Sequence, residues 1–486
     1  MRTTLSEDAF FIDRDRPEGL QMQLRQAIAS SILAGRLRGG DRMPSSRKLA
    51  QHLKISRITV TLAYQELIAD GYLESRDRSG YFVADTAPVL QNPAQKIPEK
   101  SAQISWDTRF VRRASGLRQV EKAFDWRRYD YPFIYGQADL DLFNHSAWRA
   151  CAHRALGRRD FDSLAGDYVE KDDPELVDFI ARQTLPRRGI AARPEEILIT
   201  LGAQNALWLV SHLLLGPGRM AILENPGYPG LRDVLAQSGA EVVPTDVDED
   251  GLPPDRIPPA ADVVFATPSH QAPTTVTMSM DRRRELLKRA ARDDFVIVED
   301  DYEFELSFLR APFPALRSMD DAGRVIYVGS FSKSLFPGLR LGYMVAPEPF
   351  IQQARALRTT MLRHPPGHIQ RTTAYFLALG HYDALIRRMR DAFQIRRQAM
   401  ADAITDLGLT TSHASNFGGT SFWMEAPVGT DTDLLAERVR ADGVLIEPGG
   451  PFFAGDDGPC RFYRLGYSSI DAKKIRPGLA RLKDQL

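Results

Sequence analysis

Short apolar runs alternate with helical stretches from about residue 195 onward, and this alternation constrains the fold more than any other feature of the sequence. The runs MAILE at 220–224, DVVFAT at 262–267 and FVIVED at 295–300 are separated by segments that repeat apolar positions at helical spacing. Strands that alternate with helices build a mainly parallel sheet with helices on both faces. The sequence therefore predicts an α/β domain, and a mixed segment from 420 to 467 predicts a smaller α+β lobe after it.

The first 83 residues predict a separate, mostly helical unit. Three segments repeat apolar positions at helical spacing, and a short two-stranded feature follows them. The next stretch, 86–103, contains three prolines and many polar residues without periodicity, which is typical of a linker. We therefore divide the chain into a small N-terminal domain at 1–83, a linker at 84–130, a large domain at 131–355 and a small C-terminal lobe at 356–486.

The bulk composition excludes several classes of protein. Lys plus Arg and Asp plus Glu number 63 each, so any affinity for nucleic acid must come from a local patch. No apolar run resembles a signal peptide or reaches the roughly 18 residues of a membrane span, which predicts a cytoplasmic protein without membrane contact. The two cysteines, Cys151 and Cys460, exclude a CxxC-type metal or redox framework, and we predict no metal site.

Two helices joined by a short turn at Lys54 to Ser56 have the spacing of a helix-turn-helix motif. Ser56 is suited to cap the second helix, whose first residues are the ones that reach base edges in such motifs. A basic, Gly-containing turn between the two strands that follow predicts a wing, with Arg78 near its tip. Residues 20–83 carry ten Lys or Arg against five acids, a local surplus of five positive charges. The residues predicted to contact DNA are Arg47, Ser56, Arg57, Thr59, Thr61, Arg76 and Gly80.

Spacing alone leaves open that these arginines are ordinary solvated residues of a small helical domain. The runs GRL from Gly35, MPSSRKLA from Met43, SRITV from Ser56, YQEL from Tyr64 and SGYFV from Ser79 resemble the GntR-type winged helix over its whole length. This resemblance implies a winged helix-turn-helix domain that binds a double-stranded DNA operator.

One lysine, Lys333, comes just after an apolar strand, with hydroxyl side chains beside it and Arg340 seven residues later. A lysine held in a pocket of low dielectric loses its proton more easily and forms a Schiff base with an aldehyde. Ser330, Ser332 and Arg340 are suited to hold a phosphate. The segment 200–205 joins a strand to a helix, where free backbone N–H groups also favour a phosphate.

Two further strand ends carry residues that suit a flat, nitrogen-containing cofactor. Asp300 ends a strand, and a carboxylate beside a pyridine nitrogen keeps that nitrogen protonated. Tyr302 is placed to bond a ring hydroxyl, and Tyr228 follows another strand, where its ring can stack on the cofactor. Taken singly, each of these residues also fits a plainer role as a helix cap, a turn aromatic or a core contact.

Taken together and in order, these motifs resemble those of fold-type I aminotransferases from about residue 130 to 470. The resemblance implies that Lys333 carries pyridoxal 5'-phosphate, that Asp300 pairs with the pyridine nitrogen, and that Tyr302 and Tyr228 contact the ring. The implied phosphate cup consists of Ala203, Gln204, Ser330, Ser332 and Arg340, to which a neighbouring subunit adds Tyr168. Near the C-terminus, RFYRLGYS resembles the family's substrate-carboxylate motif, which carries over to Arg464. A surface ion-pair arginine remains the alternative there.

The chain departs from the aminotransferase pattern at TPSHQAPTT, where Ala272 occupies the position of an Asn that bonds the ring hydroxyl. The loss leaves Tyr302 to serve alone or with help from His270 or Gln271, and we place His270 with Arg464 among the effector-binding residues. The same segment resembles MocR-type regulators, which fuse a GntR winged helix to an aminotransferase-like domain in this order. That resemblance implies a head-to-tail homodimer that detects small amines.

Three functions remain open at this point. In the first, an amine or amino-acid-like effector forms an external aldimine with the cofactor on Lys333 and alters operator binding. In the second, the protein is an active aminotransferase with a vestigial or autoregulatory DNA-binding extension, and in the third it answers to free pyridoxal phosphate. Members of the family that it resembles respond to γ-aminobutyrate, taurine, ectoine-derived diamino acids or dipeptides, and the sequence does not choose among them.

Overall fold

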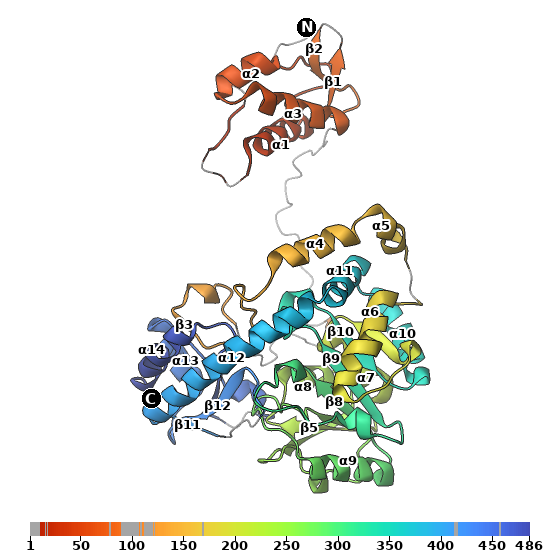
Figure 1. Cartoon of the computed structure of the whole chain (residues 1–486), viewed down its shortest axis with the longest axis vertical. Coiled ribbons are helices and arrows are strands. Elements are labelled where there is room, and N and C mark those ends of the chain that lie inside the picture. The colour runs from red at the N-terminus through yellow and green to blue at the C-terminus, as the bar shows by residue number, and fades with distance from the viewer. Residues whose placement is uncertain are drawn as a thin grey trace. The chain divides into compact units, whose positions relative to one another are not determined.

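The computed structural model describes two compact units, Met1–Arg112 and Arg113–Leu486 (Figure 1). The division between them lies inside the stretch 84–130 that the sequence assigns to a linker. Within them, the structure describes residues 10–14, 16, 18–76, 79–88, 106, 109–110, 120, 122–167, 170–412, 417–455 and 458–486.

The first unit is a winged helix-turn-helix. Its core consists of apolar side chains from all three helices, among them Leu24, Leu49, Val60 and Leu67, each of which is fully buried. The two strands pair antiparallel and form the wing. The elements are α1 (Leu20–Leu33), α2 (Ser46–Leu53), α3 (Arg57–Ala69), β1 (Leu73–Arg76) and β2 (Gly80–Val83).

Two serine caps set the ends of the helix-turn-helix. The Ser45 hydroxyl accepts a hydrogen bond from the backbone N–H of Lys48, and the Ser56 hydroxyl accepts one from that of Ile58. Between the helices, Lys54 adopts a left-handed conformation with φ of 53°, which ends α2 sharply. The prediction that Ser56 caps the second helix is confirmed, and the cap fixes Arg57 as the first residue of α3.

The second unit is built on a seven-stranded sheet in the order β4-β10-β9-β8-β7-β5-β6. Strand β10 runs antiparallel to both of its neighbours, whereas all the other neighbouring pairs are parallel. The predicted mainly parallel sheet is therefore confirmed. The strands are β4 (Ile197–Thr200), β5 (Met220–Asn225), β6 (Glu241–Asp246), β7 (Val263–Ala266), β8 (Val296–Asp301), β9 (Val325–Ser330) and β10 (Gly342–Val345).

Helices cover both faces of this sheet, and successive strand residues alternate between the two layers. In β4, Leu198 packs in one cluster with Leu207 of α7, while Ile199 packs in another with Phe376 of α11. The helices of the second unit are α4 (His145–Ala155), α5 (Arg158–Ala165), α6 (Pro174–Phe179), α7 (Ala203–Leu214), α8 (Pro229–Ala236), α9 (Met280–Asp293), α10 (Glu348–Leu362), α11 (Gly367–Ala378), α12 (His381–Asp406), α13 (Thr432–Ala441) and α14 (Ala472–Lys483).

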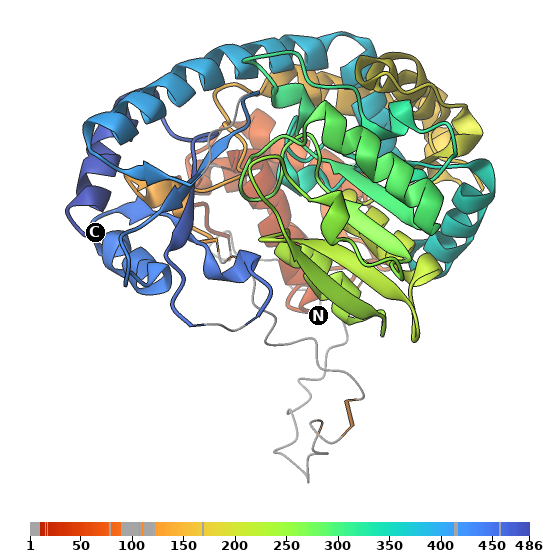
Figure 2. The ribbon, with the colours of Figure 1, turned by 90° about the horizontal axis from the view of Figure 1, so that it is seen from below.

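A smaller lobe follows the large sheet, and the 26-residue helix α12 extends from the large lobe to this smaller one (Figure 2). It contains a four-stranded antiparallel sheet in the order β11-β12-β15-β14. No helix in the described parts of the chain combines the length and apolarity needed to cross a membrane. The strands of the lobe are β11 (Thr410–Thr411), β12 (Ser421–Glu425), β13 (Val444–Leu445), β14 (Glu447–Pro448) and β15 (Phe462–Gly466).

The start of the second unit belongs to this smaller lobe. Strand β3 (Tyr131–Pro132) pairs parallel with β13 and lies against α14, although we assigned residue 131 to the large domain. A two-residue strand carries no periodicity, so the sequence gives no signal for this pairing. The chain thus enters the second unit through the small lobe.

Candidate functional site

A cavity of about 520 Å³ lies where the large sheet meets the small lobe. This volume suits a cofactor together with a small ligand. Every described residue that the sequence assigned to the cofactor lines it, and Arg464 of β15 lines it too. The predicted residues that the structure brings together are Ala203, Gln204, Tyr228, Asp300, Tyr302, Ser330, Ser332, Lys333, Arg340 and Arg464. Tyr168, predicted to serve a neighbouring subunit, lies outside the described residues.

Lys333 follows β9, and its amine lies in a confined place beside Tyr135 and Gly136. The Lys333 Nζ lies 3.9 Å from the centroid of the Tyr135 ring. Gly136 has φ of +70°, and a Cβ at this position would come within 2.0 Å of Nζ. Burial, and secondarily the charge of Lys122, lowers the pKa of Lys333 to about 7. A sizeable fraction of this amine is therefore neutral and nucleophilic near neutral pH.

Asp300, near the end of β8, lines the cavity with its carboxylate. Its Oδ1 is buried and has no hydrogen bond to any described residue. Burial, with the nearby charges of Asp301 and Glu224, raises its pKa to about 7. An N–H group or a cation in the cavity would satisfy this atom, and the protonated nitrogen of a pyridine ring is such a group.

The N-terminus of α7 and the side chain of Arg340 line the same cavity. Gly202 precedes this helix with φ of +76°, and a Cβ there would come 3.3 Å from the Arg340 guanidinium. Arg340 donates to the Leu201 carbonyl oxygen at 3.4 Å. A helix N-terminus and an arginine at close quarters favour a phosphate. Ser330 accepts a hydrogen bond from the Ser332 backbone at 3.1 Å, which orders the hydroxyl-bearing turn on the opposite side.

Tyr228 and Gln204, which line the cavity, are hydrogen-bonded to each other. The Tyr228 hydroxyl donates to Gln204 Oε1 at 2.9 Å, and Gln204 Nε2 donates to the Gly230 carbonyl oxygen at 2.8 Å. Tyr228 is 40% exposed, so one of its faces remains open to a flat ligand. Residues that fit an aldehyde, a ring nitrogen, a ring face and a phosphate are therefore present in one cavity, and the donor set suits pyridoxal phosphate.

Two side chains expected to assist Tyr302 have other positions. His270 is 2% exposed and does not line the cavity, and the nearby charges that act on it are those of Asp301, Arg188, Arg283 and Arg397. Burial lowers its pKa to about 4. The Gln271 amide donates to Glu224 and to backbone carbonyl oxygens. Ala272 lines the cavity whereas His270 does not, and the contact of His270 with the effector stays a prediction.

Three residues that the sequence analysis missed complete the site around Arg464. Arg464 Nε donates to Glu447 Oε2 at 2.7 Å, and the guanidinium lies 4.0 Å from the Tyr135 ring centroid. Lys122 also lines the cavity. These residues come from distant parts of the chain and share no motif, so only the tertiary fold brings them together.

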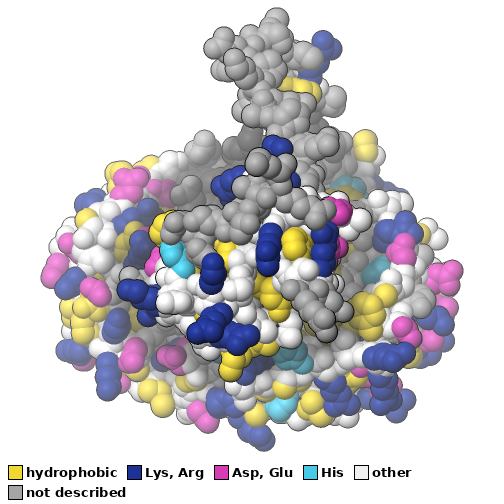
Figure 3. All heavy atoms as spheres, turned by 90° about the horizontal axis from the view of Figure 1, so that it is seen from above, with side chains coloured by type: hydrophobic (Ala, Val, Ile, Leu, Met, Phe, Trp, Pro, Cys, Tyr) yellow, Lys and Arg dark blue, Asp and Glu magenta, His cyan; other side chains and the backbone are white. Residues whose placement is uncertain are grey.

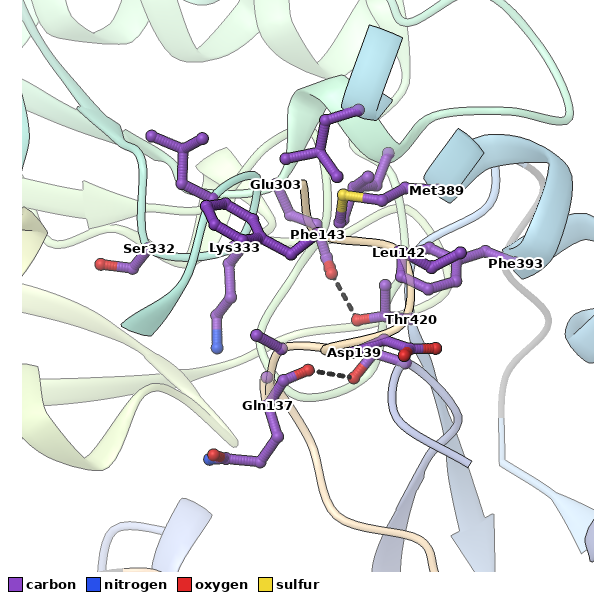
Figure 4. A pocket seen from close by; sticks show the side chains of 16 residues that line it. Gln137, Asp139, Leu142, Phe143, Glu303, Ser332, Lys333, Met389, Phe393 and Thr420 are labelled. Carbon is purple, nitrogen blue, oxygen red and sulfur yellow. Dashed lines mark hydrogen bonds between the residues drawn. The ribbon is translucent and has the colours of Figure 1, made fainter. Parts of the chain in front are cut away.

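A second, small cavity lies on another side of Lys333 (Figure 4). The Glu303 carboxylate, 2% exposed, accepts a hydrogen bond from Thr420 and one of 3.4 Å from the Tyr135 hydroxyl. Burial raises the pKa of Glu303. A buried acid therefore stands next to the lysine, and hydrogen bonds from Tyr135 and Thr420 hold it in place.

The DNA-binding prediction concerns one face of the first unit. Arg47 and Arg57 are both exposed, and Arg57 Nε donates to Ser46 Oγ at 3.3 Å, which orients its guanidinium. Thr59 and Thr61 are half-buried, and Thr61 donates to the Arg57 carbonyl oxygen at 2.9 Å. Lys and Arg side chains are more frequent than acidic ones on the face of this unit that Figure 3 shows.

In the wing, the side chain of Arg76 is engaged by neighbouring residues. Arg76 Nε donates to Glu74 Oε1 at 2.7 Å, and its guanidinium lies 4.6 Å from the Phe82 ring centroid. An arginine engaged in this way has less freedom to meet a phosphate. Gly80 opens β2 with φ of +103°, as the tight wing turn requires, whereas Arg78 lies outside the described residues.

Comparison with known proteins assigns both units to families. The family model described as bacterial regulatory proteins, gntR family, matches residues 20–83, and the model described as aminotransferase class I and II matches residues 154–482. The HTH-type transcriptional regulator TauR of Rhodobacter capsulatus is 54% identical over 475 residues, which cover 98% of this chain and 98% of that protein.

Other relatives share the whole arrangement or the second unit alone. The probable rhizopine catabolism regulatory protein MocR of Rhizobium meliloti is 31% identical over 475 residues, which cover 97% of this chain and 94% of that protein. The solved structure of LysN, an alpha-aminoadipate aminotransferase from Thermus thermophilus complexed with N-(5'-phosphopyridoxyl)-L-leucine, is 29% identical with a TM-score of 0.70. That match covers 79% of this chain and 98% of the LysN chain.

The family match and the donor set of the cavity agree on the cofactor. Class I and II aminotransferases use pyridoxal phosphate, and this chain keeps a lysine, a carboxylate, an aromatic ring and a helix N-terminus around one cavity. Pyridoxal phosphate is therefore the cofactor of the second unit. The chain belongs to the MocR-type transcription regulators, in which a gntR-family DNA-binding domain is fused to an aminotransferase class I and II domain.

Proposed function

We propose that this regulator senses a small amine with an anionic end, which binds in the large cavity and alters operator binding. The observation that carries the proposal is that Lys333 and Arg464 line the same cavity, in a chain whose first unit is a gntR-type domain. Lys333 follows a strand of the large lobe, whereas Arg464 lies in β15 of the small lobe. An effector whose nitrogen reaches Lys333 and whose anion reaches Arg464 is selected by its length.

Different residues of the cavity bind different parts of the cofactor and of the effector. When bound, pyridoxal phosphate supplies an aldehyde carbon that bonds to Lys333 or, in exchange, to the nitrogen of an effector amine. Lys333 would hold the cofactor through its amine and would take up a proton at Nζ when an effector amine replaces it. Asp300 holds the ring N–H, while Arg464 pairs with the effector anion. The effector changes operator binding through different affinities for two conformations of the protein.

We further propose that the domain senses without efficient turnover. Ala272 lines the cavity with a methyl group where related aminotransferases carry an amide, and the Gln271 amide is held by Glu224 and backbone carbonyl oxygens. Tyr302 is then the group that remains for the ring hydroxyl. One donor that tunes the cofactor for transamination is therefore missing.

A second candidate function is an active aminotransferase with an autoregulatory DNA-binding extension. The presence of Lys333, Asp300 and Arg464 around one cavity favours it. A sensor of free pyridoxal phosphate would use nearly the same residues. The head-to-tail homodimer that the family resemblance implies stays a prediction, since Tyr168 lies outside the described residues.

One assay separates these functions. Wild-type protein is mixed with candidate amines and a keto-acid acceptor, and cofactor absorbance, keto product and operator affinity are recorded in the same samples. The proposal expects an absorbance shift with altered operator affinity and negligible product. Rapid multiple turnover without any change in operator affinity would establish the aminotransferase instead. A response to pyridoxal phosphate that no amine modifies would establish the cofactor sensor.

We expect Arg57→Ala and Arg47→Ala to weaken operator binding in different ways. Arg57 opens the recognition helix, so its loss should cost about 1–3 kcal/mol and relax specificity at one base pair. Arg47 lies in the first turn of the preceding helix, so its loss should weaken binding to all sequences alike and reduce the salt slope by about 1. Titrations of operator and random DNA at several salt concentrations measure both effects.

Arg25→Ala is the matched control for these two variants. Arg25 lies in the same unit, but its guanidinium is engaged by Asp70 at 2.8 Å. Its loss should leave affinity and salt slope near wild type. Unchanged affinity and slope in the Arg47 and Arg57 double variant would rule out this binding face.

A further inference from the structure

Lys122 is a second cation in the cavity where we propose that Arg464 binds the anionic end of the effector. It belongs to the second unit, ten residues after the boundary at Arg112, and it precedes the first strand of the small lobe. Its side chain, 32% exposed, lines the same cavity as Arg464 and Lys333. No motif marks this lysine in the sequence, and its position arises from the fold alone.

One buried carboxylate links Lys122 to Arg464. The Lys122 Nζ lies 3.6 Å from Glu447 Oε1, while Arg464 Nε donates to Glu447 Oε2 at 2.7 Å. The Tyr135 backbone N–H also donates to Glu447 Oε1, at 3.2 Å. Glu447 is fully buried, so its negative charge interacts with these two cations and not with solvent. Two cations share one anion, so the cluster of Lys122, Arg464 and Glu447 has more positive than negative groups.

Both cations keep hydrogen-bond donors for a ligand. Lys122 Nζ donates to the Tyr135 carbonyl oxygen at 2.6 Å and pairs with Glu447, which accounts for two of its three N–H groups. Of the Arg464 guanidinium, only Nε has a hydrogen bond to a described residue. The Arg464 Cζ lies 4.0 Å from the centroid of the Tyr135 ring and 4.6 Å from that of the Phe452 ring.

The electrostatics of Lys122 favour an incoming anion. Burial lowers its pKa and the positive charge of Arg464 lowers it too, whereas Glu447 raises it. The charge of Lys333 lies close enough to interact with Lys122 as well. An anion placed between Lys122 and Arg464 would offset the repulsion between these cations, which a neutral group in the same place cannot do.

We propose that Lys122 is a specificity-determining residue that binds the anionic end of the effector together with Arg464. This inference rests on the proposed amine-sensing function and deepens it, because it assigns the choice between anionic and neutral amines to a pair of cations. An amine that ends in a carboxylate or sulfonate is bound, and an amine of the same length with an uncharged end is rejected.

The test uses the full-length protein loaded with pyridoxal phosphate. The probes are β-alanine, 4-aminobutyrate and 5-aminopentanoate, each compared with the alkylamine that lacks its carboxylate. Absorbance titrations give the affinity, and operator titrations follow in the same samples. Lys122→Met should lower the affinity of the acid that binds wild type best by about tenfold or more relative to that of its alkylamine. This ratio cancels any effect of Lys122 on the pKa of Lys333, which acts on both probes alike. Lys122→Arg should restore most of the loss.

Lys288→Met is the matched control, because Lys288 is an exposed lysine on α9 and does not line the cavity. Equal losses for acids and alkylamines, or wild-type affinity for the acids, in a folded Lys122→Met protein would overturn the assignment of Lys122 while leaving the amine sensor intact. If wild type binds alkylamines as tightly as the acids, the cation pair does not select. If neither class of amine shifts the wild-type spectrum, the sensor proposal itself fails.

Discussion

Lys333→Ala should abolish covalent attachment of pyridoxal phosphate and, with it, every response of operator binding to amines. Lys333 is partly buried beside Tyr135, with a pKa of about 7, so it is the cavity lysine that is most readily neutral at working pH. Lys122, which lines the same cavity, is engaged by Glu447 and by the Tyr135 carbonyl oxygen. Operator binding without effector should persist, because α3 belongs to the other unit.

Visible absorbance of the purified protein measures this effect, and borohydride reduction followed by peptide mass analysis locates the modified lysine. Lys288→Ala, which changes an exposed lysine on α9, should remain coloured and responsive. A borohydride-trapped adduct on a different lysine of the Lys333→Ala protein, with normal absorbance, would contradict the assignment.

Arg464→Ala should weaken the effector by about ten- to a hundredfold while cofactor absorbance and effector-free operator binding persist. The arginine contributes a charge-assisted pair, worth roughly 1.5–3 kcal/mol. The structure adds an expectation that the sequence does not supply. Glu447 is fully buried and would keep only Lys122 and a backbone N–H as partners, so the variant should also unfold at a lower temperature.

A double variant separates these two consequences. Glu447→Gln in the Arg464→Ala background removes the uncompensated buried charge, so thermal stability should recover in part. Effector affinity should stay low, because the partner of the anion is still absent. Absorbance titrations and thermal unfolding measure the two properties independently. Recovery of effector affinity in the double variant would show that Arg464 acts through stability and not through contact.

The sequence predicted the layers of the fold because periodicity is a local property. The run at 295–300 differs by a single residue at each end from strand β8, and that at 220–224 lies within β5. The antiparallel direction of β10 and the pairing of β3 with β13 were not predictable, because strand direction and partner are set by tertiary packing.

The same distinction explains which site residues were found. Lys333, Asp300 and Tyr228 each follow or end a strand, so strand ends that meet at one edge of a sheet brought them together. Lys122 and Glu447 come from segments without such a signal and converge only in the folded lobe. His270 and Ala272 lie in the same irregular loop, where neighbouring side chains face different directions, and of the two only Ala272 lines the cavity.

Because β3 pairs with β13, the chain that comes from the DNA-binding unit joins the small lobe and not the large sheet. Lys333 follows a strand of the large lobe and Arg464 lies in the small lobe, so the effector of the proposed function would contact both lobes. The length of that effector would then set the distance between the lobes. A hinge motion that changes this distance would therefore also move β3 and β13, where the chain from the DNA-binding unit joins the small lobe.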